Sequence, residues 1–331
     1  MNKNILILVL AFSFFTACNN EKKDPVNDNK SNPNISKELT LYTHRHYPSD
    51  QELFAQFEKE TGITINVVNA SADELIQKMT LEGSESPADA LITVDAGRLV
   101  RASNGGLLQP VKSSFLDSII PSHLKDENGL WFGLTKRARV IAYAKDRINP
   151  EELSTYENLA SDRWKNKILV RSSGNIYNQS LMASIIANSG EDVAKNWGKN
   201  LVKNMARSPK GNDRDQVKAV VAGEGDLAIV NTYYIGKLLK SKKPEEVKAG
   251  EGVGIFFPNQ NDRGAHINVS GIGVAKYAPN KENAIKFIEF LASDKAQKVF
   301  ATANFEYPVN PNVEPSDLLK SWGSLLMDLK T

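Results

Sequence analysis

The stretch ELTLYTHRHYPSDQELFAQFEKETGITINVVNA, residues 38–70, decides the fold class. Residues 38–44 alternate between apolar and polar side chains, as a strand with one buried face does. Residues 51–62 then carry apolar side chains at helical spacing and end on Gly62, a residue type that commonly stops a helix. Residues 63–70 predict another strand, so the local order is strand, helix, strand.

Strands and helices keep alternating along the rest of the chain. Residues 72–83 show helical spacing, and residues 88–95 form a nearly continuous apolar run that is typical of a buried parallel strand. Residues 131–146 contain two apolar strand-like runs around a basic loop, and residues 215–234 predict a helix, a glycine stop and a strand. The alternation predicts an α/β fold, and 331 residues are enough for two domains.

The composition excludes several classes of function. With 41 Lys and Arg against 39 Asp and Glu, the chain has no overall basic charge, so we expect no nucleic-acid partner. The glycine clusters at 250–254 and 271–275 lack the complete nucleotide-binding pattern, and the sequence contains no zinc-protease or serine-hydrolase motif. Because the sequence has a single cysteine, disulfides and cysteine-based zinc sites are excluded as well. We therefore expect that the protein is not an enzyme.

The N-terminal residues predict an export signal and a tether. Residues 1–17 combine an early lysine, an apolar run and small residues, as a secretory signal peptide does. Cys18 follows at once and resembles the lipid-modified cysteine of bacterial lipoproteins; the alternative is an ordinary signal peptide followed by a free thiol. Residues 18–37 are too polar to fold, so we expect a lipoprotein held on a flexible tether in the periplasm or at the cell surface.

Tyrosines follow three of the predicted strands at the point where each strand ends. They are Tyr47 in the segment HRHY, Tyr177, and the adjacent pair Tyr233 and Tyr234. Because ligand-binding loops of open α/β sheets lie at the carboxyl ends of strands, we expect these phenols to meet at one edge. An adjacent pair that converges on one point would lie in a loop or at the end of an element. The alternative is that the tyrosines are amphipathic packing groups with solvated hydroxyls.

Phenol groups that meet in this way favour a hard, highly charged cation. Such an ion prefers anionic oxygen over sulfur or neutral nitrogen. A free phenol titrates at about pH 10, so only a strongly polarising ion displaces its proton at neutral pH. Ferric iron meets this requirement, whereas calcium and magnesium favour carboxylates and carbonyl oxygens. Four phenolates also more than balance a 3+ charge, which allows the ion to be buried.

Several segments together resemble the bacterial ferric-iron-binding proteins of ABC importers, in the tyrosine-rich class that includes the cyanobacterial and Campylobacter proteins. The segments, between Leu39 and Val313, are LYTHRHYPSDQELFAQFEKETGI, RARVIAYAKD, YNQSL, GDLAIVNTYYIG and NFEYPVNPNV. The resemblance implies a metal site formed by His46, Tyr47, Tyr177, Tyr233 and Tyr234.

The resemblance also suggests roles for the residues around this site. Arg45, Arg137 and Arg139 are candidates for holding a synergistic anion such as carbonate or for supporting the phenols, and His44 and Arg45 would line the rim. We interpret the remaining candidates as core or structural tyrosines: Tyr42, Tyr143 and Tyr307.

The fold implied by the resemblance is a type II periplasmic-binding-protein fold, with two α/β lobes and a ligand cleft between them. Its first lobe would comprise residues 38–136 and 264–331, and its second lobe residues 137–263. The protein would be a monomer that carries ferric iron to the permease of an ABC importer in the inner membrane. We expect the metal to favour the closed form, to release protons on binding and to bind more weakly in acid.

Two other functions are alternatives. A binding protein of the same fold could carry an anion, a polyamine or thiamine, although a cluster of phenols suits neither a phosphate nor a polyamine well. A secreted metal-dependent hydrolase would need an open coordination position and a general base. The sequence offers no set of histidines and carboxylates that would supply them.

Overall fold

The computed structural model describes residues 36–330. The predicted signal peptide, Cys18 and almost all of the predicted tether therefore lie outside the described residues. Within residues 36–330, no helix combines the length and the apolar character that a membrane span requires.

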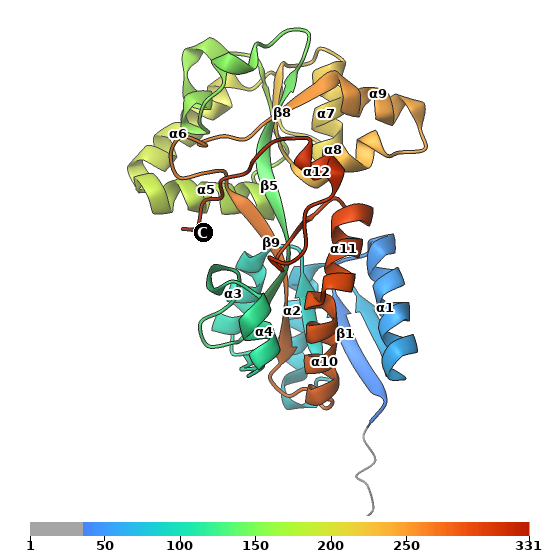
Figure 1. Ribbon diagram of the computed structural model, residues 1–331. Coiled ribbons are helices and arrows are strands. Elements are labelled where there is room, and N and C mark those ends of the chain that lie inside the picture. Colours follow the sequence, from blue (N-terminus) through green and yellow to red (C-terminus); the bar gives the residue numbers. More distant parts are fainter. Residues whose placement is uncertain (1–35, 331) are drawn as a thin grey trace, which may run out of the picture. The chain divides into compact units, whose positions relative to one another are not determined.

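The first lobe is built on the strands that begin the chain (Figure 1). β1 pairs in parallel with both β2 and β3, as the strand–helix–strand order predicts. The strands of this lobe are β1 (Glu38–Thr43), β2 (Thr64–Asn69), β3 (Ala90–Thr93), β4 (Leu108–Gln109) and β10 (Tyr307–Pro308). Its helices are α1 (Pro48–Thr61), α2 (Ala72–Glu82), α3 (Ala96–Asn104), α4 (Ser114–Ile119), α10 (Lys281–Ala292) and α11 (Asp294–Ala303).

The second lobe repeats the α/β plan with shorter strands. β7 pairs in parallel with β6, and β8 lies antiparallel to the strand β5 described below. The strands are β6 (Ile168–Leu169), β7 (Leu227–Asn231) and β8 (Val253–Phe256). The helices are α5 (Ile176–Ser189), α6 (Glu191–Asn204), α7 (Asp213–Val221), α8 (Thr232–Leu239) and α9 (Pro244–Gly252), and the short α12 (Asp317–Lys320) lies near the C-terminus.

Two long strands, β5 (Phe132–Ala144) and β9 (Ile267–Ala275), connect the lobes (Figure 1). β9 pairs with β3 in the first lobe and with β5, and β5 continues into the second lobe, where it pairs with β7. The prediction of two runs around a basic loop is therefore wrong, because one strand of 13 residues spans the region. Its basic residues can lie inside a strand since Arg137 and Arg139 pair with buried carboxylates.

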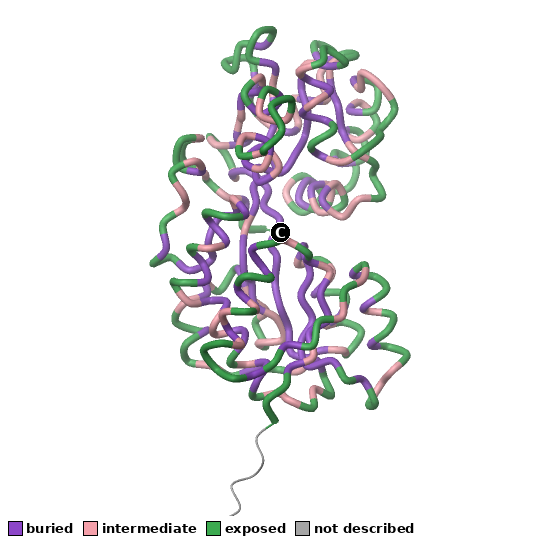
Figure 2. The backbone as a smooth tube through the Cα atoms, turned by 90° about the vertical axis from the view of Figure 1, so that its right-hand side faces the viewer, coloured by how far each residue is buried: buried purple, intermediate pink, exposed green. Residues whose placement is uncertain are grey.

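Buried residues follow these strands through both lobes and through the connection between them (Figure 2). The first lobe packs its helices on β1, β3 and β9 around large apolar side chains such as Phe57 and Phe287. The second lobe has its own core around Trp164 and Trp197. Each lobe is thus stabilised by its own apolar burial, and the two-lobe α/β fold predicted from the sequence is confirmed. The exact lobe boundaries stay a prediction.

Candidate metal site

Each predicted tyrosine ligand lies at the start of a helix. Tyr47 is the N-cap residue of α1, a few residues beyond the end of β1. Tyr177 lies in the first turn of α5, and Tyr233 and Tyr234 lie in the first turn of α8, directly beyond β7. The prediction that the adjacent pair lies at the end of an element is confirmed. Each phenol thus follows a strand, as the strand-end rule predicts.

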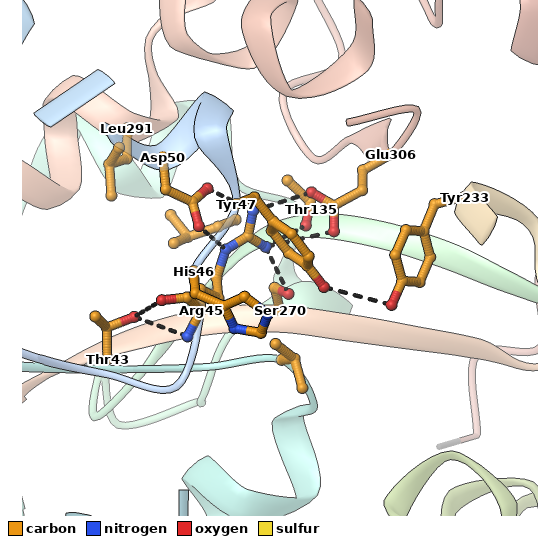
Figure 3. A network of polar contacts seen from close by, with 12 residues as sticks. Thr43, Arg45, His46, Tyr47, Asp50, Thr135, Tyr233, Ser270, Leu291 and Glu306 are labelled. Atoms are coloured by element: carbon orange, nitrogen blue, oxygen red, sulfur yellow. Dashed lines mark hydrogen bonds and ion pairs between the residues drawn. The ribbon is translucent and has the colours of Figure 1, made fainter. Parts of the chain in front are cut away.

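These phenols line one cavity between the lobes, with a volume of about 160 Å³. The hydroxyl of Tyr47, from the first lobe, donates a hydrogen bond of 3.4 Å to the hydroxyl of Tyr233, from the second (Figure 3). The rings of Tyr233 and Tyr234 lie 4.1 Å apart between centroids. The lining comprises His44, His46, Tyr47, Val94, Arg98, Arg171, Asn175, Ile176, Tyr177, Tyr233 and Tyr234. All of the residues predicted as metal ligands are among them.

Burial keeps the phenols of Tyr47, Tyr177 and Tyr233 protonated. Tyr177 is 4% exposed and Tyr233 is 2% exposed. Removal from water raises the pKa of Tyr47, Tyr177 and Tyr233 above the ordinary value of a phenol, and the positive charge of Arg137 offsets only part of this effect. For Tyr233 the neighbouring phenols raise the pKa further. A ligand that binds them as phenolates must therefore be a strongly polarising cation.

The donor set differs from that of a conventional protein metal site. Among residues 36–330, no group of three or more His, Cys, Asp or Glu side chains could hold a metal ion. The cavity instead offers phenol oxygens and the imidazole of His46. Anionic oxygen from phenolate suits a small trivalent cation better than it suits zinc, which prefers nitrogen and sulfur, or calcium, which prefers carboxylates.

Arg45 lies in the interior rather than at the rim, so that part of the sequence prediction is wrong. It is 3% exposed and pairs with the carboxylates of Asp50 at 2.8 Å and Glu306 at 3.1 Å (Figure 3). Its guanidinium carbon lies 4.9 Å from the ring centroid of Tyr47. The charge is buried because two carboxylates compensate it, and one of them is distant in the sequence.

Arg137 and Arg139 are also committed to protein partners. Arg137 donates from Nε to Glu306 at 2.6 Å, and its guanidinium carbon lies 5.3 Å from the ring centroid of Tyr233. Arg139 pairs with Asp213 at 2.6 Å, and neither side chain is exposed. Neither arginine lines the cavity, so neither is placed to contact a bound ligand directly. Arg137 instead contacts the ring of Tyr233.

The pair Arg139–Asp213 holds the two helices that carry the second lobe's tyrosines. Arg139 donates to the side-chain oxygen of Asn178 in α5 at 2.6 Å and to that of Asn231, the N-cap residue of α8, at 3.2 Å. Asp213 accepts a hydrogen bond of 2.8 Å from the backbone N–H of Asn231. One buried ion pair therefore fixes the starts of α5 and α8 relative to β5.

We expect Asp213→Asn to lower the free energy of unfolding by about 3–5 kcal/mol, because it leaves the buried guanidinium of Arg139 uncompensated. Urea unfolding followed by circular dichroism measures this loss. Asp192→Asn, on the exposed first turn of α6, is the matched control and should change stability by less than about 0.5 kcal/mol. Equal unfolding midpoints for the two variants would contradict this role of the pair.

The histidines occupy different environments. His46 is exposed and lines the cavity beside Tyr47, with 5.7 Å between the ring centroids. His44 also lines the cavity, and burial with nearby Arg98 lowers its pKa to about 4. The geometry is therefore compatible with His46 as a ligand, and it makes His44 a neutral wall residue at pH 7.

Sequence reasoning missed two arginines that line the cavity and a lysine that contacts one of the phenols. Arg98 and Arg171 line it, and both follow strand ends, so the rule that found the tyrosines could also have found them. The Nζ atom of Lys237 lies 3.8 Å from the ring centroid of Tyr47. Lys237 is four residues after Tyr233 on α8, a spacing that predicts one shared helix face. Burial lowers the pKa of Lys237 to about 8.

The tyrosines interpreted as structural do not line the cavity. Tyr42 is completely buried and donates to the carboxylate of Glu82 at 3.0 Å. Tyr143 lies on β5 and Tyr307 on β10, and neither lines the cavity. The distinction between these residues and the clustered phenols agrees with the sequence prediction.

Two α/β lobes joined by crossing strands, with a small polar cavity lined from both lobes, define a solute-binding protein of the type II class. Residues 43–298 match the family described as "Bacterial extracellular solute-binding protein". The chain belongs to this family.

Proteins named for iron uptake and ferric iron binding are among the relatives of this chain. The chain is 48% identical to iron uptake protein A1 of Synechocystis sp., over 97% of this chain and 88% of that protein. It is 30% identical to the major ferric iron-binding protein of Neisseria meningitidis, over 83% of this chain and 82% of that protein. The resemblance inferred from the sequence is therefore confirmed.

Solved structures of iron-binding proteins are also similar to this chain. A Trichodesmium protein, IdiA or FutA, in complex with iron and citrate ligands, superposes with a TM-score of 0.85 at 52% identity, covering 88% of this chain and 92% of that one. The ferric binding protein of Campylobacter jejuni gives a TM-score of 0.85 at 47% identity, with the same coverage.

Proposed function

We propose that this protein captures one ferric ion in the cavity between its lobes and delivers it to an ABC-type importer. The observation that carries the proposal is the gathering of the phenols of Tyr47, Tyr177, Tyr233 and Tyr234 in one largely buried cavity. Relatives at 48% and 30% identity are named for iron uptake and ferric iron binding, which supports the same cargo. The family is one of solute-binding proteins, which agrees with the prediction that the chain is not an enzyme.

The four phenols act as anionic ligands in this proposal, and His46 supplies a nitrogen at the exposed side. Four phenolates around one ferric ion have a net charge of −1. The ammonium of Lys237, 3.8 Å from the Tyr47 ring centroid, offsets it. A divalent ion would leave a further negative charge in the cavity, so the arrangement favours a trivalent cargo.

A bound anion, such as carbonate or citrate, would meet Arg98 and Arg171 in this proposal. Both arginines line the cavity. Arg137 and Arg139, the sequence-based candidates, are engaged by Glu306 and Asp213 and fit better as supporting residues. The Trichodesmium structure contains citrate together with iron, which supports co-binding of an anion.

Delivery follows from the family and from the two-lobe geometry. Metal contacts from both lobes would favour the closed form and present it to a permease in the inner membrane. We further propose that the protein acts as a monomer, anchored through a lipid on Cys18, with lobes at 38–136 plus 264–331 and at 137–263. Mass spectrometry of the membrane-extracted protein tests the lipid.

Thermal unfolding of the purified protein with a panel of ligands tests the cargo. Ferric citrate at about 100 times its dissociation constant should stabilise the fold by about 2.7 kcal/mol. Gallium(III) is the redox-inert control and should also stabilise it. Phosphate, spermidine and thiamine represent the other cargoes that a protein of this fold could carry, and zinc represents a divalent metal. Stabilisation by one of these ligands without any effect of iron would refute the proposed cargo.

A further inference from the structure

The segment NFEYP, residues 304–308, does not line the cavity. It follows α11 and lies in the first lobe, with Tyr307 and Pro308 paired to β5. Phe305 adopts a φ of +56°, in the left-handed region, which is uncommon for a residue with a bulky side chain. Backbone strain of this kind persists only where the surrounding structure enforces it. The turn is therefore held in place by its contacts.

Glu306, the next residue, is a completely buried carboxylate that binds two guanidiniums, and Figure 3 shows that of Arg45. Oε1 accepts from Nε of Arg137 at 2.6 Å, and Oε2 accepts from Arg45 at 3.1 Å. Burial by itself would raise the pKa of Glu306, but the two guanidiniums outweigh it and lower this pKa to about 2. The carboxylate is therefore ionised throughout the neutral range.

The two guanidiniums lie against phenol rings of different lobes. Arg45 lies 4.9 Å from the ring centroid of Tyr47, and Arg137 lies 5.3 Å from that of Tyr233. Arg137 also donates to the backbone oxygen of Val94 at 2.5 Å and to the hydroxyl of Ser270. One carboxylate thus fixes the cations that stack on the two phenols joined across the cavity.

Phe305 makes the second connection, to the helix that carries Tyr233 and Tyr234. A Cβ atom at Gly236 of α8 would lie 2.7 Å from the Cβ and Cγ atoms of Phe305. Only glycine at position 236 therefore lets α8 approach the turn this closely. The turn reaches the second lobe through Phe305 and the first lobe through the Glu306–Arg45 pair.

We propose that the Phe305–Glu306 turn is a positioning element of the iron site, which sets Tyr47 and Tyr233 through Arg45 and Arg137 and sets α8 through Gly236. The inference rests on the proposed function, since it concerns the same phenols. The competing explanation is that Glu306 only neutralises buried charge and that Phe305 only fills space.

Glu306→Asp separates these explanations because it keeps the charge but retracts the carboxylate by one methylene, so that it no longer reaches both guanidiniums. Removing a residue that supports a metal ligand typically costs about 10–100-fold in metal affinity. We expect a loss in this range in competition with a ferric chelator, together with a shifted phenolate-to-iron absorption band. Wild-type affinity and an unshifted band in this variant would overturn the proposal.

Phe305→Gly provides a second variant, which keeps every charge and relieves the left-handed backbone. It should fold, shift the same band and weaken iron binding; if Glu306→Asp does not fold, an unshifted band in this variant overturns the proposal. Asp89→Asn is the control, because Asp89 is completely buried directly before β3 and does not line the cavity. This variant should lose stability but keep the wild-type affinity for iron and the wild-type absorption band. Absence of the band in the wild type would refute the proposed function instead.

Discussion

Replacement of Tyr177 or Tyr233 by phenylalanine is expected to lower the affinity for ferric iron by more than about 100-fold. Loss of a supporting residue typically costs about 10–100-fold, and loss of a ligand should cost more. Both phenols are almost completely buried, so no water easily takes the place of the missing oxygen. Affinity is measured by competition with a ferric chelator of known strength.

Tyr143→Phe is the control for this prediction, because Tyr143 lies on β5 and does not line the cavity. It should bind iron as the wild type does. Tyr47→Phe removes the phenol of the first lobe and should lower the affinity in the same way as the second-lobe variants. Equal affinities of Tyr233→Phe and Tyr143→Phe would show that the clustered tyrosines do not ligate the metal.

Capture of one ferric ion is expected to release about four protons at neutral pH, one from each phenol that becomes a phenolate. Burial raises the pKa of Tyr47, Tyr177 and Tyr233, so these groups are fully protonated in the metal-free protein at pH 7. Because the iron-bound state holds fewer protons than the metal-free state, the affinity for ferric iron rises with pH.

The expected slope is about tenfold per pH unit for each phenol, or about 10⁴-fold per unit for all four. Proton release is measured with a pH indicator in weak buffer while iron is added, with correction for the protons of the ferric chelate. Tyr233→Phe should release about one proton fewer. An affinity that does not change between pH 5 and pH 7 would contradict phenolate ligation.

Local periodicity was sufficient to predict the α/β class, whereas the two-lobe arrangement came from the family resemblance. Alternation at residues 38–44 and helical spacing at 51–62 depend on neighbouring residues, and the structure has β1 and α1 there. The strand-end rule then identified Tyr47, Tyr177 and the adjacent pair as neighbours. The rule accounts for Tyr177 and the adjacent pair in the second lobe, whereas Tyr47, from the first lobe, meets them because both lobes line the cavity.

The errors arose where a charge is compensated by a residue that is distant in the sequence. Arg137 looked like part of a basic loop, but its partner Glu306 is 169 residues away. Arg45 looked like a rim residue, but Glu306, 261 residues away, holds it inside the protein. A single sequence does not reveal such partners, so buried arginines in a crossing strand resemble an exposed loop.

The most direct test of the central claim is a visible absorption titration of the metal-free protein with a weak ferric chelate. Phenolate ligation predicts a coloured charge-transfer band that saturates at one iron per chain and is weakened or shifted in Tyr233→Phe and Tyr234→Phe. The absence of such a band at every ratio of iron to protein would contradict the account, and the phenols would then serve packing or another ligand.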